Sequence, residues 1–121
     1  MNMTEWSKVS EILDEIRAQE SILDVSLISR GGMYIMGDPP GGVHHETFAA
    51  MSAIIMGAAE TTSSELRDSL NKVVIMLAEK DLVLTSAGPK YMIAIALRLN
   101  NDVNATMREA REKISRLEKN L

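Results

Sequence analysis

The amino-acid sequence predicts an α+β domain, a three-layer sandwich in which helices cover both faces of a five-stranded, mostly antiparallel sheet. Two observations lead to this fold class. Apolar residues recur at helical spacing in three segments and alternate in five others, which gives the order α-β-β-α-β-β-β-α. Two of the expected strands, 71–79 and 90–99, are apolar on both faces, so helices must cover both sides of the sheet.

The first half of the chain predicts two helices with a hairpin between them. Thr4 is the expected N-cap of the first helix, whose apolar residues begin with Trp6 and Val9. Arg30-Gly31-Gly32 supplies the tight turn of the hairpin. The second helix is rich in Ala, Met and Ile and contains no proline. The expected elements are a helix at 4–19, strands at 22–29 and 33–36, and a helix at 46–67.

The second half changes to the period of strands. Lys80-Asp81 and Gly88-Pro89 are the expected turns between three strands of a meander. After the capping cluster Asn100-Asn101-Asp102, apolar residues return at alternating four- and three-residue spacing. The expected elements are strands at 71–79, 82–87 and 90–99 and a closing helix at 103–121.

Length and composition restrict the function classes. A chain of 121 residues without a linker or repeat predicts a single domain, 1–121. The 13 basic residues are scattered among 17 acidic ones, which argues against nucleic acid as a partner. The N-terminal segment is acidic and amphipathic rather than a signal peptide, and the longest apolar run, 49–59, is too short to insert directly into a membrane. We therefore expect a cytoplasmic protein.

The segment GDPPGGVHHETF, residues 37–48, contains the residue types of a phosphate loop and of a metal site. Val43 stands where a phosphate loop needs lysine, and Pro39 and Pro40 lack N–H donors. His44 and His45 are adjacent, whereas two ligands on one helical face lie three or four residues apart. We predict a connecting loop, with no cofactor, metal ion or catalytic residue, although a zinc-dependent activity through the two histidines would reverse this interpretation.

The second helix carries two apolar faces. One face is expected to pack on the sheet and contains Phe48, Met51, Ile55, Ala58, Ala59 and Thr62. The other is expected to point outward and contains Ala49, Ala53, Met56 and Gly57. Small residues on an outward face allow a second helix to approach closely, so we infer that this helix pairs with a copy of itself or a homologue. The alternative is that the first and third helices cover this face within one chain.

The strand at 71–79 supports an intermolecular partner. It is apolar on both faces and would be an aggregation-prone edge unless a second chain paired with it. The complete predicted dimer interface is Ala49, Ala53, Met56, Gly57, Val74 and Met76.

The order of elements, together with the hairpin LISRGGMYI, the helix AAMSAIIMGAAE and the strand entry GPKYMIAIAL, resembles the Roadblock family. This family includes dynein light chains, endosomal adaptor subunits and regulators of small GTPases, and the resemblance spans about residues 5–118. It implies a homodimer or heterodimer in which the second helices pair and the third strands pair. It also implies a noncatalytic scaffold that recruits or regulates a small Ras-like GTPase, and it supplies no catalytic residue.

Two other function classes fit the same element order. Profilin-like and longin-like domains share it, so an adaptor in trafficking, motor or cytoskeletal assembly without a GTPase partner is the second hypothesis. A small-molecule sensor is the third and requires a polar-lined cavity between sheet and helices. The sequence shows no cluster of inward polar residues for such a cavity.

Overall fold

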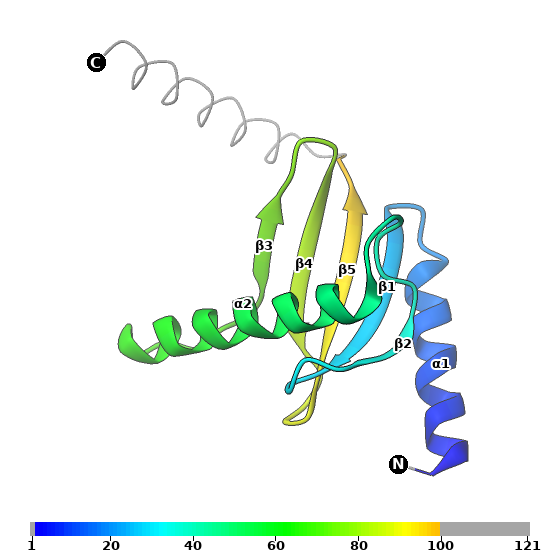
Figure 1. Cartoon of the computed structure of the whole chain (residues 1–121), viewed down its shortest axis with the longest axis horizontal. Helices are drawn as coiled ribbons and strands as arrows, with labels where there is room; N and C mark the ends of the chain where they lie inside the picture. The colour runs from blue at the N-terminus through cyan, green and yellow to red at the C-terminus, as the bar shows by residue number, and fades with distance from the viewer. Residues whose placement is uncertain (1, 100–121) are drawn as a thin grey trace.

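The computed structural model describes residues 2–99, which form two helices and five strands (Figure 1). The helices are α1 (Met3–Arg17) and α2 (His45–Glu65). The strands are β1 (Ile22–Ser29), β2 (Tyr34–Gly37), β3 (Val73–Met76), β4 (Lys80–Ser86) and β5 (Tyr91–Arg98). The helix predicted at 103–121 lies outside the described residues.

The five strands form one sheet in the order β2-β1-β5-β4-β3, and every neighbouring pair is antiparallel. β5 is the central strand and pairs with β1 along its length, for example Val25 with Ile95 and Leu27 with Ile93. The fold class predicted from the sequence is therefore confirmed, and β2 and β3 are the two edges among the described strands.

Alternate residues of the central strand belong to different core clusters. Met92 and Ala94 pack with residues of α2, whereas Ile93 and Ile95 pack with residues of α1. Because successive side chains of a strand point to opposite faces, α1 and α2 cover opposite faces of the sheet. Figure 1 shows α2 running across the strands and extending beyond β3, while α1 lies beside β1 and β2.

The start of α1 corrects the expected cap. The side chain of Asn2 accepts the N–H of Glu5 at 2.9 Å, so Asn2 is the N-cap and Thr4 lies inside the helix. Leu13 is buried against the sheet, and Trp6 contacts the ring of Tyr91 edge-on at a centroid distance of 6.0 Å. These contacts fix α1 over β1 and β5.

The connection between β3 and β4 is also displaced from its predicted position. Lys80, expected in the turn, is the first residue of β4 and pairs with Arg98. The turn is Ala78-Glu79, because the N–H of Leu77 donates to the carbonyl of Lys80 at 2.9 Å. β3 is consequently a short strand of four residues rather than the predicted 71–79.

Gly37 offers a test of the packing at the β1–β2 edge. Its φ is +95°, and an added Cβ would lie 2.5 Å from the carbonyl oxygen of Val25. We expect Gly37→Ala to lower the free energy of unfolding by about 1–3 kcal/mol or more, because a non-glycine residue is strained in this backbone conformation. Gly41→Ala is the control, since no atom lies within 4 Å of its added Cβ. Urea titrations of both variants measure the difference, and equal midpoints would contradict the packing described.

Candidate interaction surface

Helix α2 exposes an apolar face to solvent. Met51 is 53% exposed and Ile54 is 62% exposed, although both are large hydrophobic residues in the middle of a helix. Ala50, Gly57 and Ala58 are exposed beside them. No charged residue occurs in α2 between Glu46 and Glu60. A contiguous exposed face of this kind is typical of an interaction site.

The C-terminal part of α2 is less polar than its sequence indicates. The hydroxyl groups of Thr61, Thr62 and Ser63 donate to the carbonyls of the residues four positions earlier, at 2.8–3.0 Å. These hydroxyls are therefore satisfied within the helix. The apolar face can extend toward the C-terminus of α2 without leaving donors that a partner would have to bind.

The predicted division of α2 into an inner and an outer face is correct for Phe48 and Ile55, which pack against the core, and wrong for several other residues. Ala49 is 0% exposed and Met56 is 1% exposed, and both belong to the core between α2 and the sheet, with Ala53 packed against them. Of the four residues predicted to point outward, Gly57 alone is exposed. Met51 and Ala58, predicted to contact the sheet, are exposed instead.

The physical reason is the close approach of α2 to the β1–β2 turn. A Cβ added at Gly32 would lie 3.2 Å from the Cα of Ala50 and 3.6 Å from the Cβ of Ala53. The alanines therefore leave room for the hairpin of the same chain rather than for a second helix. This contact turns Met51 and Ile54 toward solvent.

The edge strand β3 holds the other two predicted residues, Val74 and Met76. Val74 is 44% exposed and Met76 is partly buried. Val73 packs against the core beneath α2, so Val74 and Met76 point to the opposite face of the sheet. Among the described residues β3 pairs only with β4, and its other edge is open.

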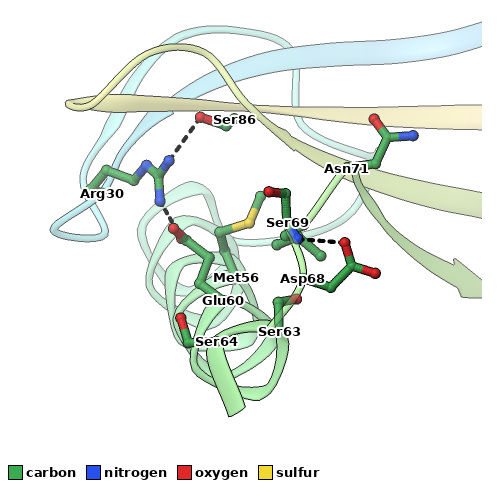
Figure 2. A pocket seen from close by; sticks show the side chains of 10 residues that line it. Arg30, Met56, Glu60, Ser63, Ser64, Asp68, Ser69, Asn71 and Ser86 are labelled. Atoms are coloured by element: carbon green, nitrogen blue, oxygen red, sulfur yellow. Dashed lines mark hydrogen bonds and ion pairs between the residues drawn. The ribbon is translucent and has the colours of Figure 1, made fainter. Parts of the chain in front are cut away.

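A polar pocket of about 320 Å³ lies beside the C-terminal part of α2 (Figure 2). The guanidinium group of Arg30 forms an ion pair with Glu60 and donates to the hydroxyl of Ser86 at 2.8 Å. The other polar residues at its wall are Ser63, Ser64, Asp68, Ser69 and Asn71. Sequence reasoning missed this pocket, because its residues come from four separate segments with no motif in any of them.

The contacts of Arg30 indicate a structural role. Its side chain connects the β1–β2 turn, α2 and the end of β4, and its backbone N–H donates to the carbonyl of Lys90 at 2.9 Å. The charge of the guanidinium group is compensated by Glu60. We therefore interpret Arg30 as a structural residue that holds α2 against the sheet.

The two histidines have different neighbours. His44 is the N-cap residue of α2, and its Nδ1 lies 3.4 Å from the hydroxyl of Thr47. The ring of His45 packs on Tyr34 at a centroid distance of 4.8 Å. Within residues 2–99, no three His, Asp or Glu side chains gather in a metal-binding arrangement. No helix in this part of the chain has the length and apolar character needed to cross a bilayer.

Comparisons with known proteins agree with this fold. The uncharacterized protein MJ0714 of Methanocaldococcus jannaschii is 27% identical over 111 residues, which cover 89% of this chain and 94% of that protein. The structure of Myxococcus xanthus MglB superposes with a TM-score of 0.72 at 14% identity and covers 97% of this chain and 99% of MglB. A structure of MglB with a tetrameric arrangement has the same TM-score at 16% identity and covers 92% of this chain and 86% of that one.

The Roadblock/LC7 domain model matches residues 8–97, which include α2, most of α1 and all five described strands except the last residue of β5. This match spans well over half of the chain and confirms the resemblance seen in the hairpin, the second helix and the last strand. The chain belongs to the Roadblock/LC7 domain family.

Proposed function

We propose that the protein is a noncatalytic, self-associating scaffold that recruits or regulates a small Ras-like GTPase in the cytoplasm. The observation that carries the proposal is the exposed apolar face of α2 around Met51 and Ile54. Family membership supports it, because Roadblock/LC7 proteins are adaptors and regulators of small GTPases.

The geometry of α2 supports a second copy of the chain as the first partner. The C-terminal turns of α2 extend beyond β3, and most of their residues are exposed (Figure 1). The open edge of β3 lies on the same side of the molecule. A second copy related by a twofold axis near β3 would cover both the exposed turns of α2 and the open edge of β3. In such a dimer each α2 contacts the α2 of the other copy, and each β3 contacts the other β3.

The revised interface keeps part of the sequence prediction. It retains Gly57, Val74 and Met76. It excludes three residues that pack in or against the core between α2 and the sheet, namely Ala49, Ala53 and Met56. Met51, Ile54 and Ala58 replace them on the outer face of α2. The small residues Gly57 and Ala58 allow a second helix to approach closely, and Met51 and Ile54 beside them supply apolar surface for the contact to bury.

Self-association is tested by placing a charge on the apolar face. We expect Ile54→Glu to weaken dimerisation at least about a hundredfold, since an unpaired charge buried at an interface costs roughly 3 kcal/mol. Light scattering should then give the 13.3 kDa mass of one chain, against twice that mass for the wild type. Gly57→Glu should act in the same way.

Ile12→Glu is the matched control for the Ile54 variant. Ile12 is 52% exposed on α1, on the opposite side of the sheet from α2, so its variant should remain dimeric. Circular dichroism verifies that each variant is folded. A wild-type chain that stays at the mass of one chain, or a folded Ile54→Glu dimer, would refute the proposed interface.

The GTPase part of the proposal needs a nucleotide-dependent experiment. We expect the protein, used as bait in its native lysate, to capture a Ras-like GTPase at least about tenfold better with a GTP analogue than with GDP, which is 1.4 kcal/mol of discrimination. The measurement is quantitative mass spectrometry of the captured proteins. Capture of actin or coat components without nucleotide dependence would contradict this part and favour the longin-like or profilin-like adaptor.

A further inference from the structure

The ion pair at the wall of the polar pocket uses only part of the hydrogen-bonding capacity of Arg30. Nη1 contacts Glu60, and Nη2 donates to the hydroxyl of Ser86 at 2.8 Å and to the carbonyl of Gly88 at 3.5 Å. Nε is buried and has no partner among residues 2–99. A guanidinium group presents its N–H donors in a planar fork that matches both oxygens of a carboxylate. Glu60 therefore engages Arg30 through a single nitrogen and leaves this fork incomplete.

The two partners of the ion pair are held unequally. Arg30 is fixed at the end of β4 by Ser86 and Gly88, and its side chain is 28% exposed. The side chain of Glu60 is 42% exposed, and its hydrogen bond within residues 2–99 is the one to Arg30. An ion pair this exposed contributes little to stability, because its carboxylate stays partly hydrated. Glu60 can therefore turn into solvent while Arg30 keeps its position.

The charges around the pocket select the chemical class of a ligand. Asp68 is the other charged residue at the wall, and its Oδ1 accepts the N–H of Ser69 at 2.7 Å. Figure 2 shows the carboxylate of Asp68 on the opposite side of the pocket from Arg30. A cationic ligand would be repelled by Arg30, and a dianion such as phosphate would be repelled by Asp68. A single carboxylate fits this arrangement best, because one negative charge replaces that of Glu60.

The rest of the pocket suits the stem that carries such a carboxylate. Met56 and Leu70 supply apolar surface, and Met56 is buried in the core beneath α2. The remaining polar residues are neutral and can donate hydrogen bonds to an oxyanion. They are Ser63, Ser64, Ser69, Asn71 and Ser86. A volume of about 320 Å³ accommodates a carboxylate on a few methylene groups, as in a glutamate side chain.

We propose that this pocket binds a carboxylate group on a short apolar stem, which pairs with Arg30 in place of Glu60. In the unbound chain Glu60 occupies the position of the ligand's carboxylate and competes with it. The carboxylate belongs either to an acidic side chain of a protein partner or to a free carboxylic acid, since both offer the same chemistry. The pocket is formed within one chain, so this inference depends on neither the proposed self-association nor a GTPase.

Opposite effects of the two ion-pair partners test the proposal. Acetate is the probe, and it replaces chloride at constant ionic strength while amide chemical shifts of pocket residues are followed in the full chain. We expect Glu60→Gln to bind acetate about fivefold more tightly than the wild type, because the competing carboxylate is removed. Arg30→Gln should bind acetate at least about tenfold more weakly, because the guanidinium group is lost. If the ion pair were only structural, neither substitution would raise the affinity.

Asp38→Asn is the matched control for Glu60→Gln. Asp38 pairs with Arg17, the two side chains are 53% and 50% exposed, and neither residue lines the pocket. Its variant should therefore leave the acetate affinity of the pocket unchanged. Circular dichroism verifies that each variant is folded. Arg30→Lys is the second variant if Arg30→Gln folds poorly, and it should bind at least roughly threefold more weakly, since lysine keeps the charge and lacks the fork.

A second probe separates the two sources of the carboxylate. N-acetylglutamic acid α-amide carries the side-chain carboxylate of glutamate alone. Binding at least as tight as that of acetate indicates an acidic side chain of a partner, and binding of acetate alone indicates a free acid; both support the pocket.

Three results would overturn the inference. They are a Glu60→Gln variant that binds acetate no better than the wild type, an equal gain in Asp38→Asn, and tighter binding of phosphate than of acetate. A wild-type chain that is monomeric by light scattering would refute the proposed self-association and leave the carboxylate site standing.

Discussion

The structure depends on a central strand that is apolar on both of its faces. Met92 and Ala94 point to one side of β5, and Ile93 and Ile95 point to the other. Each side must be covered, and residues 2–99 provide one helix for each: α1 over β1 and β5, and α2 across the other face. Within residues 2–99, each helix is therefore the only one on its face of the sheet. No second helix in this range packs beside α2 to cover its outer residues. The exposure of Ile54 follows directly from this division.

The orientation of α2 about its own axis is decided by the β1–β2 turn. Gly32 has a φ of +92° and brings the turn to within a few ångströms of Ala50 and Ala53. A larger residue at any of these positions would push the helix away from the hairpin. Arg30, from the same turn, holds the helix from its other end through Glu60. One short turn thus sets both the distance and the rotation of α2, and with them the set of side chains that remain exposed.

Sequence reasoning predicted the fold well because strands and helices differ in hydrophobic period, and both periods are clear in this chain. It could not assign the faces of α2, because periodicity separates two apolar faces without stating which one meets the sheet. The prediction that Ala49 and Met56 point outward is wrong for this reason, because a Met in a core and a small Ala beside a glycine turn fit the inner face equally well. The position of Val74 on an edge strand depends on the order of the strands in the sheet. It does not depend on how a helix is rotated about its axis. The polar pocket around Arg30 depends on tertiary contacts alone.

The two exposed features of the molecule constrain each other. An apolar helix face alone fits many partners, and an open strand edge alone fits any extended segment. Here α2 extends past β3, so a partner that adds to the edge of β3 must also pass beneath or beside the last turns of α2 (Figure 1). A lone peptide strand would leave Ile54 and Met51 in water, and a lone helix would leave the edge of β3 unpaired. A second copy satisfies both requirements with one axis, because it brings its own strand to the edge and its own helix to the face.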